Sequence, residues 1–307
     1  MNRNLRIGRV LLALVPLLTG SAAHAVALAN RVFVSARSGN YANSCDNILT
    51  PCQTFAGAIL QLNPGGEAIV LDSGGYGPVT ITQSVIIEAP PGVLAFIHPP
   101  SGTAITISAG SSDVVTLRGL VLNGGYGNGI TVNTVGVLHV ENCVISGFTS
   151  GGLETYAAGS VFINDTVVRE NDFGLIFYGG RASIDHCRVE NNQGIGIYVD
   201  GADVTVRDSV SAGNSNSGFA AESGGAENSI LNVERCLSAN NTHDGFETFK
   251  GGSGFVIARA SNSSLSENIR YGINNVSGVT FESLGNNFVR GNVGGDVNGT
   301  ITVVGGQ

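Results

Sequence analysis

The sequence predicts an all-β protein whose chain winds as a parallel solenoid, and two observations support this prediction. First, 45 of the 307 residues are Gly and only 12% are charged. Disordered segments are charge-rich and long helices are built from Ala, Glu, Lys, Leu and Arg, so both classes are excluded. Second, a short pattern recurs every 21 to 24 residues between residues 110 and 290. Such a period is typical of stacked structural repeats.

Residues 1–25 have the order of a secretory signal peptide. Three Arg precede the apolar run 10–18, and the small-x-small site Ala23-His24-Ala25 follows it. The run is too short to span a bilayer, and a buried first helix would give the three Arg no role. We therefore expect export, cleavage near Ala25 and a secreted or periplasmic mature chain. Ala27-Leu28-Ala29 is a second cleavage site.

The charge of the mature chain restricts its partners. Removing residues 1–25 leaves 12 of the 15 basic residues against 23 acidic ones, a net charge of −11. Nucleic acid is therefore not expected as a ligand, and an acidic polysaccharide would be repelled unless a divalent cation or a local Arg cluster intervened. A neutral glycan meets no such barrier. No later segment is apolar enough to span a membrane.

Residues 26–66 are expected to form an N-terminal cap with a disulfide. Cys45 and Cys52 share one short loop of an exported chain, which favours a bond between them. Closing so short a loop stabilises by about 2 to 3 kcal/mol. The alternative is a metal half-site, but no matching Cys/His pair follows in the sequence.

The cap is also expected to contain a short helix. Thr50-Pro51-Cys52-Gln53 has the form of a capping box with Pro at the first helical position. Phe55, Ile59 and Leu62 then fall on one helical face, and Asn63-Pro64-Gly65-Gly66 ends the helix. This helix would cover the open apolar end of the solenoid.

Residues 67–307 are expected to form the solenoid itself. Its first coils are irregular, and beyond residue 286 we expect a strand only at 300–304. The early strands are predicted at 68–71, 79–82, 85–88, 94–97 and 103–107.

The repeat consists of two columns of residues. In the first, an aliphatic residue precedes a mostly small one by three positions, with one step of 27 residues among the shorter ones. This inward column is predicted to hold Leu120, Cys143, Thr166, Cys187, Ser209, Cys236 and Ala260. The second column pairs Gly with an apolar residue, at Gly129-Ile130, Gly152-Leu153, Gly174-Leu175, Gly196-Ile197, Gly218-Phe219, Gly245-Phe246 and Gly272-Ile273.

Each period therefore contains about three short strands separated by Gly and Asn turns. Stacking the turns at about 4.8 Å pairs each strand with its counterparts and encloses an apolar interior. Leucine-rich repeats would need a different motif, and sandwiches or propellers would need regular hairpin turns. Cys143 and Cys187 would lie two coils apart, beyond disulfide reach, so we expect buried free thiols.

These features resemble the right-handed parallel β-helix, or pectin-lyase-like, superfamily. The resemblance is to exported bacterial β-helix-repeat proteins, and it covers nearly all of residues 31–300. The matching motifs are Phe33-Val34-Ser35, Pro51-Cys52-Gln53-Thr54-Phe55 and Gly285-Asn286-Asn287. The superfamily includes polysaccharide lyases, glycoside hydrolases, epimerases and adhesins, so the resemblance implies the fold and leaves the activity open.

One exposed face is the candidate site. Strand alternation places the residues that follow the Gly-apolar column in two outward columns. Tyrosine rings offer apolar surfaces with a polar rim, and carboxylates accept hydrogen bonds from sugar hydroxyls. The predicted substrate-binding residues are Tyr156, Tyr178, Tyr198, Glu154, Glu247 and Phe249.

Asp200, Glu222 and Lys250 are the candidate catalytic residues of this face. In-register stacking places Asp200 beside Glu222, so the two carboxylates are expected to share a proton, bind Ca²⁺ or lean towards Lys250, the only lysine. No cofactor other than this Ca²⁺ is indicated. The insertion 224–229 follows Glu222, and solenoids place binding residues on such loops. The alternative is a face of ordinary solvated side chains.

A second candidate is Ile184-Asp185-His186-Cys187, which resembles the I-D-H run of pectate lyases, where the aspartate can take part in Ca²⁺ binding. The Trp that precedes that run is Ser183 here. Equivalent positions in other repeats hold turn residues, so a turn ladder is the competing interpretation. His139 and His243 have no second His at metal-binding spacing.

Two functions from different classes remain. The first is an exported protein that binds polysaccharide on the tyrosine and carboxylate face and modifies it if the face is catalytic, as a lyase or a hydrolase. The second is a non-catalytic surface, adhesion or structural scaffold whose solenoid only presents loops.

Overall fold

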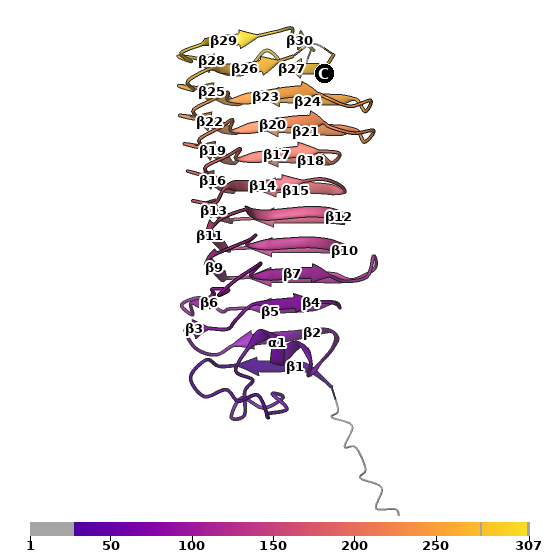
Figure 1. Cartoon of the computed structure of the whole chain (residues 1–307), viewed down its shortest axis with the longest axis vertical. Coiled ribbons are helices and arrows are strands. Elements are labelled where there is room, and N and C mark those ends of the chain that lie inside the picture. The colour runs from indigo at the N-terminus through magenta and orange to yellow at the C-terminus, as the bar shows by residue number, and fades with distance from the viewer. Residues whose placement is uncertain (1–27, 277, 306–307) are drawn as a thin grey trace, which may run out of the picture.

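The chain winds as a rod of stacked coils (Figure 1). The computed structural model describes residues 28–276 and 278–305. The N-terminal strands lie at one end of the rod and the C-terminal strands at the other, so sequence order becomes position along the axis (Figure 1). The parallel solenoid predicted from the repeat is confirmed. The predicted signal peptide, residues 1–25, lies outside the described residues.

One ladder of strands forms a separate ten-stranded sheet, in which each strand pairs in parallel with the equivalent strand of the next coil. Its members are mostly three to six residues long. In chain order they are β3 (Gly74–Gly75), β6 (Ala95–Ile97), β9 (Leu120–Gly125), β11 (Val144–Phe148), β13 (Val167–Arg169), β16 (Arg188–Glu190), β19 (Val210–Ala212), β22 (Leu237–Ala239), β25 (Ser264–Ser266) and β28 (Phe288–Arg290).

The other sheet has twenty strands in the described residues and contains two parallel ladders. The first ladder comprises β4 (Val79–Ile81), β7 (Ile105–Ser108), the first parts of β10 (Ile130–Glu141) and β12 (Gly151–Asn164), β14 (Phe173–Phe177), β17 (Ile197–Asp200), β20 (Phe219–Ser223), β23 (Phe246–Lys250), β26 (Tyr271–Asn275) and β29 (Gly295–Asn298). The second ladder comprises β1 (Ala29–Val34), β2 (Leu62–Val70), β5 (Val85–Glu88), β8 (Val114–Arg118), the last parts of β10 and β12, β15 (Arg181–Asp185), β18 (Asp203–Arg207), β21 (Ser229–Glu234), β24 (Val256–Ser261), β27 (Thr280–Ser283) and β30 (Thr302–Val303).

The interior follows the predicted columns. Cys143, Cys187 and Cys236 lie along one inward line, are at most 4% exposed and are free thiols, as predicted. Hydroxyl residues alternate with them in this line: Cys143 N–H donates to Thr166 Oγ1 at 3.3 Å, and Cys187 N–H donates to Ser209 Oγ at 3.0 Å. The column therefore combines apolar filling with bonds between coils.

The corners need a special backbone. From Cys143 to Ser263, the residue before each member of the inward column has φ near +50°, including His186 at 51° and Arg235 at 52°. That region favours Gly, Asn and Asp, so each non-glycine residue there costs free energy that the stacked neighbours must offset. The next corner is tied by a buried asparagine in six successive coils, at Asn171, Asn192, Asn214, Asn241, Asn268 and Asn292.

Two predictions about the later coils are wrong. Ser263, rather than Ala260, follows Cys236 in the inward column, because the coil between them spans 27 residues and not 24. Ala260 instead pairs with Val233 of the second ladder. Beyond residue 286 the strands β28 and β29 are present in addition to β30, so these last coils are more regular than expected.

The N-terminal region contains the predicted disulfide between Cys45 and Cys52. Helix α1 (Phe55–Ile59) follows, with Thr54 as its N-cap, and it packs against β1, β2 and β4. It begins later and ends earlier than predicted: residues 50–53, including the predicted capping box, are not helical, and Leu62 begins β2 and is buried there. Within residues 28–276 and 278–305, no helix is long and apolar enough to cross a membrane.

Candidate functional site

The predicted site residues lie where strand alternation placed them. In the first ladder Tyr198 pairs with Ala220 and Ala220 with Glu247, which makes one outward column. Asp200 pairs with Glu222 and Glu222 with Phe249, which belong to the neighbouring outward column. We call the surface made by these columns the tyrosine face; it comprises Glu154, Tyr156, Tyr178, Tyr198, Asp200, Glu222, Glu247 and Phe249.

The three tyrosines of this face contact one another on successive coils. The rings of Tyr156 and Tyr178 are stacked with centroids 5.7 Å apart, and Tyr198 meets Tyr178 edge-on at 6.2 Å. Tyr156 and Tyr178 are 49% and 39% exposed. Because Tyr156 and Tyr178 cover part of each other's faces, a ligand would meet their outward edges and hydroxyl groups as well as the free ring surface.

Carboxylates fix two of the tyrosine hydroxyl groups. Tyr156 Oη donates to Glu154 Oε1 at 2.7 Å, and Tyr198 Oη donates to Glu222 Oε2. The bond to Glu154, together with burial, raises the pKa of Tyr156 to about 12. Burial and the bond to Glu222 raise the pKa of Tyr198 further. Both phenol groups are therefore protonated near neutral pH. They can donate hydrogen bonds, and neither can act as a base.

The candidate catalytic residues are adjacent but have different partners. Asp200 Oδ1 accepts from the Gly224 backbone N–H at 2.9 Å, which ties the 224–229 insertion to the face. Glu222 is held by Tyr198 instead. In the described part of the chain, Lys250 forms no ion pair with either carboxylate. The strands thus bring Asp200 and Glu222 together, whereas Lys250 is on the same strand as Phe249 without a bond to them.

An acidic pair, partly buried Glu247 and buried Asp244, lies at the end of the tyrosine face, and Asp244 was not anticipated from the sequence. Burial raises the pKa of Glu247, and the charge of Asp244 raises it too, while a bond from Ser217 Oγ at 2.7 Å acts in the opposite direction. Asp244 is fully buried and accepts from the Tyr271 N–H at 2.9 Å and from Asn274 Nδ2 at 2.8 Å. Only the position of Asp244 directly before a column Gly could have indicated it.

The Asp185 and His186 candidate is part of a turn ladder. Asp185, His186 and Asp208 could each offer a metal ligand atom within 4.8 Å of the others. However, both oxygens of Asp208 already accept from the Arg235 guanidinium, at 2.8 Å each. His186 and Asp208 occupy the positive-φ corner column, where other coils have Asn142 or Asn262. The donor set therefore fits a corner held by ion pairs better than a cation site.

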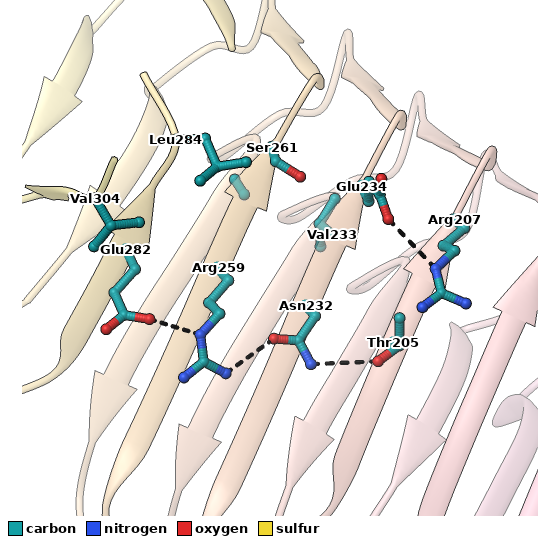
Figure 2. A pocket seen from close by; sticks show the side chains of 11 residues that line it. Thr205, Arg207, Asn232, Val233, Glu234, Arg259, Ser261, Glu282, Leu284 and Val304 are labelled. Atoms are coloured by element: carbon teal, nitrogen blue, oxygen red, sulfur yellow. Dashed lines mark hydrogen bonds and ion pairs between the residues drawn. The ribbon is translucent and has the colours of Figure 1, made fainter. Parts of the chain in front are cut away.

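Hollows in the surface lie on the neighbouring second ladder. One has a volume of about 340 Å³ and is lined by residues that include Arg207, Asn232 and Arg259 (Figure 2). A hollow of about 270 Å³ shares Thr205 and Arg207 with it. A third, of about 490 Å³, shares Ser160, Arg181 and Asp203 with the second. We call these three adjoining hollows the arginine groove.

A chain of hydrogen bonds crosses the floor of the arginine groove (Figure 2). Glu282 accepts from Arg259 Nε at 2.6 Å, and Arg259 Nη1 donates to Asn232 Oδ1 at 3.2 Å. Asn232 Nδ2 then donates to Thr205 Oγ1 at 3.3 Å. These four residues pair in register, one per coil. The repeat contained a signal for this surface, because Thr205 and Asn232 each lie four residues before a member of the inward column, Ser209 and Cys236, but their outward direction was not used.

Comparison with known proteins agrees with this architecture. A family model described as "Right handed beta helix region" matches residues 128–293. Among solved structures, a pectate lyase aligns with 84% of this chain and 75% of its own, at a TM-score of 0.66 and 17% identity. A mannuronan C-5 epimerase module from Azotobacter vinelandii aligns with 78% of this chain and 90% of its own, at a TM-score of 0.47 and 12% identity. A lacto-N-biosidase from Eubacterium ramulus aligns with 89% of this chain and 68% of its own, at a TM-score of 0.48 and 12% identity. No curated protein matches the chain in sequence.

Proposed function

The chain belongs to the right-handed β-helix family, and on this basis we propose that it is an exported protein that binds polysaccharide on the tyrosine face. The fold is compatible with this: the structural neighbour at a TM-score of 0.66 is named a pectate lyase. One fold serves many functions, however, so the proposal depends on the surface of this chain itself.

The observation that carries the proposal is the run of Tyr156, Tyr178 and Tyr198 on three successive coils, with Glu154 and Glu222 bound to two of the hydroxyls. A linear polymer lying along the rod would meet a similar set of groups at each coil. Sugar rings have apolar faces and a polar rim, and their hydroxyls can donate to these carboxylates.

Export is the second part of the proposal. The order of charge, apolar run and cleavage site in residues 1–25 supports it. The disulfide between Cys45 and Cys52 is compatible with an oxidising compartment. Protein recovered from the periplasm or the medium should have an N-terminus just after Ala25. Recovery with residues 1–25 attached would contradict export.

Modification of the glycan is a separate hypothesis, with Asp200 and Glu222 as the acid and base. Their pairing on adjacent strands supports it, because glycosidases use two carboxyl groups that flank the bond to be cleaved. Turnover of any polysaccharide that Asp200→Asn abolishes would exclude the non-catalytic scaffold. A Ca²⁺ requirement would implicate the same carboxylates as ligands.

Affinity gel electrophoresis on a glycan panel tests the binding. Tyr178→Ala should weaken the retardation by roughly tenfold in Kd, because a contact worth about 1.4 kcal/mol is lost. Tyr126→Ala is the matched control, since Tyr126 is 78% exposed but lies outside the tyrosine face. An equal loss in both variants, or no retardation of the wild type, would contradict the proposal.

A further inference from the structure

We propose that the arginine groove is a second glycan site and that it holds an uncharged, linear polysaccharide segment. This inference rests on the proposed polysaccharide binding but concerns another surface, on the second ladder and not the first. Its three hollows adjoin through shared residues, and their lining extends from β12 to β27. A site that continues over several coils fits an extended polymer better than a compact small molecule.

The groove is as large as two hollows elsewhere on the rod, of about 420 Å³ each, so its lining and not its size distinguishes it from them. The largest hollow has a volume of about 490 Å³ and the one drawn in Figure 2 about 340 Å³. Ligand sites typically occupy about 300 to 1,000 Å³ and combine apolar walls with a few convergent polar groups. Exposed Phe162, Phe255 and Leu284 supply the apolar part of the lining.

The polar groups of the groove offer both donors and acceptors. A guanidinium has five N–H donors, and Arg259 uses those on Nε and Nη1 for Glu282 and Asn232. Arg207 contacts Glu234 only through Nε, at 3.4 Å. The remaining N–H groups of both arginines are available to a ligand. Sugar hydroxyls both donate and accept, so they can satisfy this mixture, whereas an apolar ligand cannot.

The charge of the lining selects among glycans. Three arginines, Arg181, Arg207 and Arg259, face three carboxylates from Asp203, Glu234 and Glu282. The groove is therefore formally neutral, in a chain of net charge −8. A polymer with a carboxylate on every unit would approach an acidic protein without a compensating basic patch. An uncharged polysaccharide avoids this repulsion.

The groove also meets the tyrosine face. Gly180 and Gly201 line its third hollow, and they follow Tyr178 and Asp200 by two residues and one residue. One polysaccharide could thus contact both surfaces, which lie on adjacent ladders of the same sheet.

Two variants and one control test the groove, with galactomannan as the neutral probe and polygalacturonate as the acidic one. Arg259→Ala removes the three guanidinium N–H groups that are left free for a ligand, and Thr205→Leu fills part of the hollow with a larger aliphatic side chain. Each should weaken galactomannan binding by about tenfold, with the thermal unfolding midpoint as a check of folding. Arg188→Ala is the matched control, because Arg188 is exposed and ion-paired with Glu190 on the other sheet. It should bind as the wild type does.

Salt separates the two classes of ligand. Galactomannan binding should be almost unchanged between low and high ionic strength, because no net charge is neutralised. Preferential, salt-sensitive binding of polygalacturonate would overturn the neutral class. If both groove variants bind like the wild type while Tyr178→Ala loses binding, the arginine groove is not a glycan site and the proposed function stands. If the wild type binds no glycan, both fail.

Discussion

At the scale of single residues, side-chain volume determines which residues occupy the inward positions, and charge determines which occupy the outward ones. Cys143, Cys187 and Cys236 illustrate the first: burial raises the pKa of Cys143 and Cys236 to about 11 and that of Cys187 to about 12. Thiols that remain protonated inside the protein are poor nucleophiles and poor metal ligands. Their chemistry agrees with the packing role that the sequence pattern indicated.

Glu247 should make the stability of the protein depend on pH. Its folded-state pKa is raised by burial, so the stability it contributes is fully present at low pH, where the group is protonated in both states. That contribution is lost as the pH rises through the folded pKa, because the unfolded chain then releases the proton more easily. Glu247→Gln keeps an acceptor for Ser217 and removes the titration.

We therefore expect Glu247→Gln to match the wild type below about pH 4 and to melt at a higher temperature near neutral pH. Thermal unfolding followed by circular dichroism across this range measures the difference. Glu227→Gln, at an exposed carboxylate on the insertion, should show no such trend. A variant that is less stable than the wild type at neutral pH would show that ionised Glu247 stabilises the fold.

The limits of sequence reasoning at this scale are visible in Arg259. Its outward direction follows from strand alternation, but the outward residues of this strand were not considered as a site, and Ala260 beside it was assigned to the wrong column. The hydrogen bonds of Arg259 to Asn232 and Glu282 join residues 27 and 23 positions away. Only a correct register in two successive coils would have predicted them.

At the scale of elements, the buried asparagines show how one corner stabilises a whole stack. Asn214 Oδ1 accepts from both the backbone N–H and the Nδ2 of Asn192, each at 3.0 Å. Asn214 Nδ2 donates in turn to Asn241 Oδ1 at 3.1 Å and to the Val189 carbonyl at 3.3 Å. Each amide thus satisfies buried groups of its neighbours, which is a repeated and cooperative arrangement.

Asn214→Ala should destabilise the protein by about 3 kcal/mol, because it leaves buried donors of Asn192 without an acceptor. Asn133→Ala is the control: Asn133 is exposed, its amide donates only to Ser108 Oγ, and its loss should cost less than about 0.5 kcal/mol. Urea unfolding measures both. Equal midpoints for the two variants would mean that the asparagine ladder contributes little.

The predicted register of the later coils was wrong for a physical reason. The prediction assumed a step of 24 residues after Cys236, but the coil is 27 residues long, because residues 251–255 form a second loop beside the 224–228 loop of the preceding coil. The Gly column already contained this spacing between Gly245 and Gly272. Successive coils keep the same strand stacking but differ in their number of residues. Loop length can therefore vary while the strands stay in register.

At the scale of the whole molecule, a rod of coils has almost no contacts between distant turns. Each strand pairs with the coils directly before and after it, so stability is close to a sum of local contributions. The N-terminal region is joined to the rod by the pairing of β1 with β2 and by side chains, among them Asp72. Its carboxylate accepts from Ser35 Oγ at 2.6 Å, from the Ala36 N–H at 2.8 Å and from Tyr76 Oη at 2.6 Å.

Opening the disulfide should therefore loosen one end of the rod and leave the middle intact. The double substitution Cys45→Ala and Cys52→Ala frees a loop whose closure is worth about 2.5 kcal/mol. Hydrogen exchange should become faster in residues 29–76 and stay unchanged in residues 130–275, because destabilisation spreads only through neighbouring coils. The same measurement on Cys187→Ser, which puts a serine into a column that already contains Ser209, serves as the central control. Faster exchange along the full length of the double variant would mean that the rod unfolds as one unit.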